Sequence, residues 1–348
     1  MNPNPNPTCF AYDAVEQLHT LPGHPENRER LQSVMALLED RGLLDAMQAV
    51  PVSSVPRSQL HWVHAPAYVD HVQALDEAGG GHLDPDTYVV PGSYRAALAS
   101  AGALIAVVDA VITGKARNGM SLMRPPGHHA LPDRGMGFCL FANVALAARV
   151  AQRVHGLERI LIIDWDVHHG NGTEAIFYDD PTVAFFSTHQ YPYYPGTGAA
   201  EDVGQGPGRG TTMNVPLPPG VGDHGYLRIF DELLIPFAMR FQPELILVSA
   251  GYDAHWQDPL ASEGLSLLGF AQLASRVRDV AETCCAGKLA IALEGGYNRT
   301  VLSYGVMNTL LALMGEEAGA EDPIGPPAYA VPDIDDIITR IKRIHHLA

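Results

Sequence analysis

Three segments of the chain carry ionisable or polar side chains directly after apolar, β-branched runs. The run ERILIID ends in Asp164 and is followed by Asp166 and His168. The run LILVSAG is followed by Asp253, and AIALEGG is followed by Tyr297. Such runs predict strands buried on both faces of a parallel sheet. Ligands of parallel sheets bind at the carboxyl ends of the strands, so we expect the three segments to converge on one site.

The spacing of these residues favours a metal site. Side chains at alternate positions of an extended chain share one face, so Asp164, Asp166 and His168 should point the same way if the strand continues. Asp166, His168 and Asp253 then form a carboxylate–imidazole–carboxylate set, and three protein ligands with an open fourth position are typical of catalytic zinc. The oxygen-rich set also suits iron(II), so Zn²⁺ and Fe²⁺ both stay open.

A loop, MRPPGHHALPDRGMGFC, places His128 and His129 side by side between Pro-Pro-Gly and a glycine-rich stretch. A lone His-His pair is commonly incidental, and its functional interpretation here depends on the neighbouring strand ends. Hydrolysis by a metal-bound water needs a base for the water and an acid for the leaving group, and histidine suits both tasks near neutral pH. Tyr297, after two glycines, has a hydroxyl that could donate to a developing oxyanion.

The ordered motifs RPPGHHA, GFC, DWDVHHGNGT, PGTG, AGYDAH and LEGGY together resemble the histone deacetylase family, in particular class II and the bacterial histone deacetylase-like amidohydrolases. The resemblance extends from about residue 24 to about residue 314. It implies the arginase–deacetylase α/β fold, with a central eight-stranded parallel sheet and helices on both faces. It also implies a zinc-dependent deacetylase that removes acetyl or other acyl groups from N-ε-acyl-lysine or a similar acylated amine.

The resemblance further implies roles for single residues. Asp166, His168 and Asp253 match the zinc ligands, and His129 matches the general base. In the same resemblance, His128 matches an electrostatic partner that is paired with Asp164. Asn171 stands behind the second histidine, and Tyr297 matches the tyrosine that polarises the scissile carbonyl.

Further positions match the family's ion and substrate contacts. A structural potassium ion would contact Asp164, Ser187 and Thr188, partly through backbone carbonyls. A second cation would contact the backbone of Phe177, Asp180, Val183 and Thr211. The tunnel for the acyl-lysine would be lined by Gly137, Phe138 and Tyr194.

The position of Leu260 bears on the substrate. Polyamine-preferring relatives carry a Glu just after the Asp-Pro that follows the second metal-binding Asp, and this chain has Leu260 there. The substitution favours an acylated lysine in a peptide or protein, or an uncharged acylated amine. Asp84 and Asp86 in the 76–93 loop could still supply a carboxylate, so an acetylpolyamine amidohydrolase stays the alternative.

Two other classes fit less well. An arginase-like dinuclear hydrolase would need carboxylates at positions that here hold Gly170 and His255. A catalytically silent acyl-lysine reader would lack a metal ligand, His129 or Tyr297, and this chain keeps them all.

Composition limits the remaining possibilities. The 348 residues carry 22 Lys and Arg against 39 Asp and Glu, a net charge of −17, which disfavours direct nucleic-acid binding. Four cysteines without a Cys-x-x-Cys pair and a start without a signal-peptide pattern predict a reduced, cytoplasmic protein. The apolar run 96–114 is interpreted as a buried helix, so no membrane association is expected. A homo-oligomer is possible.

The pattern of alternating elements predicts one α/β domain over residues 9–348, after a flexible tail at 1–8. We expect strands at 158–166, 182–188, 244–250 and 288–294. We expect helices from about residue 27 and at 96–114, 143–156, 227–241, 270–284 and 301–314, and a loop at 76–93.

Overall fold

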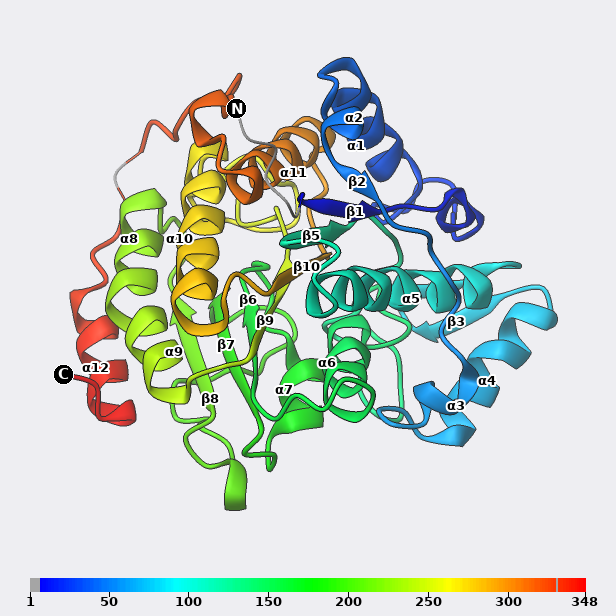
Figure 1. Cartoon of the computed structure of the whole chain (residues 1–348), viewed down its shortest axis with the longest axis horizontal. Helices are drawn as coiled ribbons and strands as arrows, with labels where there is room; N and C mark the ends of the chain where they lie inside the picture. The colour runs from blue at the N-terminus through cyan, green and yellow to red at the C-terminus, as the bar shows by residue number, and fades with distance from the viewer. Residues whose placement is uncertain (1–6, 330) are drawn as a thin grey trace.

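The computed structural model describes residues 7–329 and 331–348, and its centre is an eight-stranded sheet (Figure 1). All neighbouring strands are parallel, in the order β2-β1-β5-β10-β9-β6-β7-β8. The strands are β1 Cys9–Ala11, β2 Gln48–Ala49, β5 Asn118–Ser121, β6 Ile160–Asp164, β7 Val183–Gln190, β8 Thr212–Leu217, β9 Leu245–Ala250 and β10 Leu289–Leu293. The eight-stranded parallel sheet expected from the sequence is therefore confirmed.

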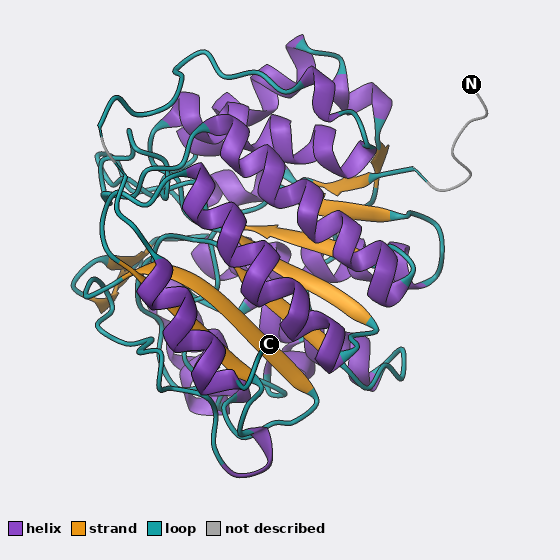
Figure 2. Ribbon diagram, turned by 90° about the vertical axis from the view of Figure 1, so that its left-hand side faces the viewer, coloured by secondary structure: helices purple, strands orange, loops and turns teal. Residues whose placement is uncertain are grey.

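Helices cover both faces of this sheet, as the turned view in Figure 2 shows. They are α1 Glu29–Asp40, α2 Leu43–Ala46, α3 Arg57–Leu60, α4 Pro66–Glu77, α5 Ser93–Ile112, α6 Asn143–Arg153, α7 Asn171–Phe177, α8 Asp223–Ile229, α9 Ile235–Phe241, α10 Leu267–Cys285, α11 Arg299–Met314 and α12 Asp335–His345. A π-helical turn, Phe230–Leu234, joins α8 to α9, next to Pro236, whose ring nitrogen cannot donate to a regular helical ladder.

The core explains why the predicted strands read as continuous apolar runs. In β6, Leu161 and Ile163 belong to the hydrophobic cluster under α1, α10 and α11, whereas Ile160 and Ile162 belong to the cluster under α5 and α6. Successive side chains of a strand point to opposite faces, and both faces are buried here, so no polar residue interrupts the run.

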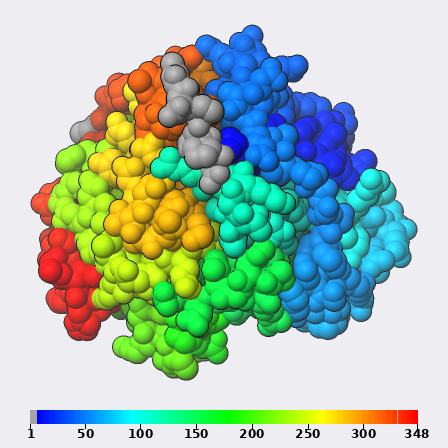
Figure 3. All heavy atoms as spheres, in the orientation of Figure 1, coloured from blue at the N-terminus to red at the C-terminus, as the bar shows by residue number. Residues whose placement is uncertain are grey.

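Segments that are far apart in the sequence lie side by side on the molecular surface. α1 packs against α11, so residues near the start of the chain lie beside residues after 299 on the face shown in Figure 3. Of the helices in the described part of the chain, α5 alone is long and apolar enough to cross a membrane, and 67% of its most apolar window is buried in the fold. This burial agrees with the interpretation of 96–114 as a core helix.

Three expectations need correction or comment. The 76–93 segment is not all loop, because β3 Gly81–Asp84 and β4 Thr87–Val89 form an antiparallel hairpin in it. The strands β1, β2, β5 and β8 escaped prediction, because short or polar-rich strands lack an apolar run. Helices α3, α4, α7 and α12 were not predicted either. Residues 1–6 of the expected tail lie outside the described residues, and Thr8 is buried and donates to Asn118 Oδ1 (2.8 Å).

Candidate active site

The carboxyl ends of three neighbouring strands, β10, β9 and β6, meet at one edge of the sheet. Register pairs Asp164 with Ser249, so the chain leaves β6 and β9 at the same level. Asp166, His168 and Asp253 then each place a ligand atom within 4.8 Å of the others. The convergence expected from the sequence is what the sheet order produces.

The chain turns directly after β6 instead of continuing as a strand. The Asp164 and Asp166 carboxylates each accept a backbone N–H from two residues further on, at 3.1 and 3.0 Å. The condition for a common direction, a continuing strand, is therefore not met: Asp164 Oδ2 lies 3.0 Å from His128 Nδ1, and Asp166 Oδ1 lies between His128 Nε2 (3.8 Å) and His168 Nδ1 (3.1 Å). These local turns position Asp166 and His168 next to Asp253.

The three candidate metal ligands, Asp166, His168 and Asp253, place two carboxylates beside one imidazole inside the protein. His168 Nδ1 lies 3.1 Å from Asp166 Oδ1 and 3.3 Å from Asp253 Oδ2. Burial by itself lowers the pKa of His168, but the hydrogen bonds and charges of the two carboxylates outweigh it and raise the pKa to about 10. Asp253 Oδ2 is buried without a hydrogen-bond partner. An orphaned carboxylate oxygen beside a second carboxylate and an imidazole fits a bound divalent cation.

The histidine pair lies in the loop after β5 and has two different surroundings. His128 Nδ1 lies 3.0 Å from Asp164 Oδ2, and His129 Nδ1 lies 2.7 Å from Asn171 Oδ1. Burial opposes a charged His128, but Asp166 and Asp164 outweigh it and raise its pKa well above the ordinary value. Burial lowers the pKa of His129 well below the ordinary value, and the neighbouring His128 and His168 add to this. Two adjacent imidazoles are thus driven to opposite protonation states.

A cavity of about 270 Å³ opens above these groups. The residues expected to line a substrate tunnel, Gly137, Phe138, Tyr194 and Leu260, all lie on its wall, with Tyr297. Its further wall residues are Asp86, Pro126, His128, His129, His168, Tyr193 and Gly295.

The residues expected to contact potassium lie on or beside β7. Ser187 pairs in register with Asp164, and its hydroxyl contacts His189 Nδ1 at 2.9 Å. Thr188 Oγ1 is buried without a hydrogen-bond partner.

The second expected set gathers at the opposite end of β7. The Phe177 carbonyl accepts the Asp180 N–H, the Thr211 carbonyl accepts the Phe185 N–H, and β7 begins at Val183. Asp180 also pairs with Arg149 at 2.7 Å.

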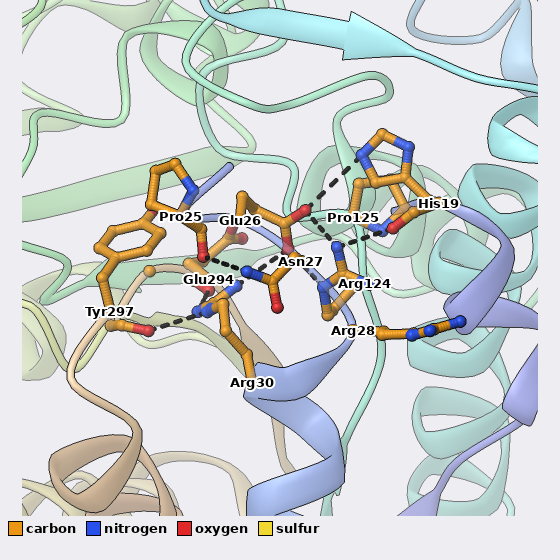
Figure 4. Close-up of polar contacts among 12 residues, drawn as sticks. His19, Pro25, Glu26, Asn27, Arg28, Arg30, Arg124, Pro125, Glu294 and Tyr297 are labelled. Carbon is orange, nitrogen blue, oxygen red and sulfur yellow. Dashed lines mark hydrogen bonds and ion pairs between the residues drawn. The ribbon is translucent and has the colours of Figure 1, made fainter. Parts of the chain in front are cut away.

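A buried ion cluster of Glu16, Glu26, Arg30 and Arg124 lies beneath the site, and Figure 4 shows the last three of these residues. The resemblance had implied Arg30 alone, as an arginine lining the inner cavity below the metal, and the other three were not predicted. Arg30 donates to the carbonyls of Glu294 (2.6 Å) and Gly296 (2.8 Å), so the cluster supports the turn that leads to Tyr297. Charged residues on a loop do not by themselves indicate burial, so the sequence offered only the proximity of HPENRER and MRPPG to the motifs.

The two carboxylates of the cluster differ in acidity. Burial alone would raise the pKa of Glu26, but Arg124 and Arg30 outweigh it and lower the pKa to about 2. Burial raises the pKa of Glu16 to about 7, because it outweighs the ion pair of its carboxylate with Arg124.

We expect Glu26 to make the protein acid-sensitive. A carboxylate with a depressed pKa stabilises the fold above its unfolded pKa of about 4.3, and this contribution of roughly 3 kcal/mol is lost as pH falls towards 2. Glu26→Gln should be less stable at pH 6 but should lose less stability between pH 5 and 2. Urea unfolding at several pH values measures this, with the exposed Glu29→Gln as control. Equal pH slopes for wild type and Glu26→Gln would refute the assignment.

Gly295 has no room for a side chain. Its N–H donates to Asp166 Oδ2 at 2.8 Å, and a Cβ at this position would overlap the Oδ2 atoms of Asp166 and Asp253. Gly295→Ala should therefore weaken Zn²⁺ binding by about 10-fold or more, measured by competition with a chelator. Gly319→Ala is the control, because its added Cβ would meet only ordinary contacts with Leu311. Unchanged affinity in Gly295→Ala would contradict the metal site.

Comparison with known proteins identifies relatives along most of the chain. A family model described as histone deacetylase domain matches residues 24–313. Histone deacetylase 14, chloroplastic, of Arabidopsis thaliana is 42% identical over 350 residues, covering 94% of this chain and 82% of that protein. The histone deacetylase-like amidohydrolase of Pseudomonas aeruginosa is 42% identical over 303 residues, covering 87% and 80%.

Two further relatives are informative about fold and substrate. The crystal structure of the HDA15 HD domain superposes with a TM-score of 0.90 at 34% identity and covers 98% of this chain and 94% of that one. The human polyamine deacetylase HDAC10 is 38% identical over 323 residues, covering 89% of this chain and 48% of that protein.

The chain is an amide hydrolase of the arginase–deacetylase fold, and it belongs to the histone deacetylase family. The deacetylase activity of that family is the activity class of this protein.

Proposed function

We propose that this protein is a zinc-dependent deacylase acting on N-ε-acyl-lysine. One observation carries the proposal: the ligand set Asp166, His168 and Asp253 lies beside His129 and Tyr297, and all but the two buried carboxylates line one narrow cavity. An acylated amine that entered this cavity would meet the metal ligands, a neutral imidazole and a phenol together.

Asp166, His168 and Asp253 would hold the zinc ion, with iron(II) as the alternative. When bound, the ion would supply Lewis acidity towards the acyl carbonyl and would acidify a water molecule. The orphaned Oδ2 of Asp253 and the two carboxylates around one imidazole support this placement.

His129 would act as the general base. Its Nδ1 faces Asn171 Oδ1, an acceptor, so Nδ1 carries the proton and Nε2 is free to take another. Because burial and the charged His128 lower its pKa, His129 is neutral and ready to accept a proton from water. It would then pass this proton to the departing amine. His128, charged and bonded to Asp164, would add positive potential near the developing oxyanion.

Tyr297 would donate a hydrogen bond to the oxyanion. Burial raises the pKa of Tyr297 well above its ordinary value, so the hydroxyl keeps its proton at neutral pH. A preorganised donor of this kind is worth about 10² to 10³ in turnover.

Bound potassium is also proposed, at Asp164, Ser187 and Thr188. The unpartnered Thr188 hydroxyl and the buried Asp164 carboxylate support this set. The second cation set, with Phe177, Asp180, Val183 and Thr211, stays a prediction. So do the cytoplasmic location, the absence of nucleic-acid and membrane partners, and a homo-oligomer.

Metal removal should abolish activity. Protein dialysed against a strong chelator is expected to release no acetate from an acetyl-lysine peptide, and added Zn²⁺ should restore the reaction because only the ion activates the water. Asp253→Ala should not recover with Zn²⁺, and metal content should fall with activity. Undiminished turnover in metal-free protein would overturn the proposed function.

The substrate class depends on the cavity mouth. Leu260 lines the cavity, and by the resemblance it stands at the position where polyamine-preferring relatives carry a Glu; this difference supports acyl-lysine. Asp86, from the turn between β3 and β4, does line the cavity, and this observation favours the alternative, an acetylpolyamine amidohydrolase.

We expect a higher kcat/KM for an acetyl-lysine peptide than for N-acetylspermidine, since only one carboxylate faces the mouth. Asp86→Asn should lower kcat/KM for acetylspermidine about 10-fold or more if Asp86 binds an ammonium group there. The exposed Asp45→Asn serves as control. A strong preference of the wild type for acetylspermidine would transfer the assignment to the alternative function.

A further inference from the structure

Asp258 is a buried carboxylate that the proposed reaction does not use. It lies in the loop between β9 and α10 and is 6% exposed. Its Oδ1 accepts the Leu260 N–H at 2.9 Å, and its Oδ2 accepts the Tyr297 N–H at 2.8 Å and the Asn298 N–H at 3.4 Å. One side chain thus bonds the backbone of two cavity-wall residues that are far apart in the sequence.

The turn that carries Tyr297 needs such attachment. Gly296 has φ +117°, a conformation that glycine adopts without strain, and two successive glycines leave the tyrosine backbone with wide freedom. The turn is held by Asp166 at the Gly295 N–H and by Arg30 at the Gly296 carbonyl. Asp258 makes the bond to Tyr297 itself.

The neighbouring contacts link the same two segments again. Asn298 Nδ2 donates to the Gln257 carbonyl at 3.2 Å, and Asn298 Oδ1 caps α11 by accepting the N–H groups of Thr300 and Val301. The loop before α10 and the start of α11 are therefore linked by several hydrogen bonds, and a carboxylate near a helix N-terminus is electrostatically favourable.

An aspartate suits this position better than its amide. Both carboxylate oxygens accept backbone N–H groups, on opposite sides of the side chain. In an asparagine, one oxygen would be replaced by an NH₂ group, which would face either Leu260 N–H or Tyr297 N–H donor to donor. The chain would then shift at one of the two walls.

We propose that Asp258 is a positioning residue: through its bond to the Tyr297 N–H it sets the place of the Tyr297 phenol for deacylation. The inference rests on the proposed role of Tyr297. It goes beyond that role because it assigns the placement of the Tyr297 hydroxyl to a carboxylate that does not itself take part in the reaction. Misplacing a reacting group by about 1 Å can cost about 10²-fold in rate.

The test is a double-mutant cycle with wild type, Asp258→Asn, Tyr297→Phe and the double variant, all on one acetyl-lysine peptide. Tyr297→Phe should lower kcat by about 10² or more. Asp258→Asn should lower kcat by about 10-fold or more with KM changed less than about 3-fold, because ground-state binding does not need the phenol. The double variant should be within about 3-fold of Tyr297→Phe, since Asp258 acts through Tyr297.

The outcomes separate the two claims. Wild-type turnover in Tyr297→Phe removes the proposed role of the tyrosine, and the inference with it. If Tyr297→Phe is slow but the two losses multiply in the double variant, Asp258 acts elsewhere and the inference alone is overturned. Asp223→Asn is the control, because that carboxylate also accepts a backbone N–H, from Ser266, away from the cavity, and its kcat should be unchanged.

A second readout does not depend on activity. Hydrogen exchange of the peptide that covers residues 294–299 should be faster in Asp258→Asn and unchanged in Asp223→Asn, with thermal unfolding reporting the integrity of the fold. If Asp258→Asn does not fold, Asp258→Ser replaces it in every measurement. The smaller serine side chain leaves space for water. Equal exchange in wild type and variant would overturn the inference.

Discussion

The structure depends on keeping two carboxylates, Asp166 and Asp253, close together in a buried place. Their mutual repulsion and loss of hydration cost free energy that the surroundings must offset. Backbone N–H groups do part of this: Gly295 donates to Asp166 and Val167 donates to Asp253, at 2.8 and 3.0 Å. Negative charge that these bonds do not offset would favour a bound cation, as proposed for this site.

The same charge governs the histidines around it. His128 shares the field of Asp164 and Asp166 and takes up a proton, and this positive charge next door helps to keep His129 neutral. The opposite protonation states of His128 and His129 therefore depend on which carboxylates each ring faces. Asn171, an uncharged acceptor behind His129, orients the ring without adding a negative charge.

Below the site, buried charge has a structural task. Glu26 lies between Arg124 and Arg30, and Arg30 reaches the carbonyls of Glu294 and Gly296. The first loop of the chain, the histidine loop and the glycine turn are joined in this way (Figure 4). Asp258 joins the same turn from the other side, so the tyrosine segment is held between two buried groups of opposite charge.

The sequence by itself determined the parallel sheet and most of the site's components. Continuous apolar runs in β6, β7, β9 and β10 reflect burial on both faces, and polar residues at three of their ends are a signal of chemistry there. Short strands such as β5 and β8 carried no such signal, because their four and six residues include polar side chains and, in β8, Pro216.

Only the tertiary structure decided how these components work. The contact of Asp164 with His128, the buried ion pair of Glu26 with Arg124, and the bond of Asp258 to the Tyr297 backbone each join positions more than 30 residues apart. Protonation and positioning depend on such distances and on the exclusion of water, which no local pattern of residues encodes. Local spacing therefore predicts which groups can react, while long-range packing sets their charge and orientation.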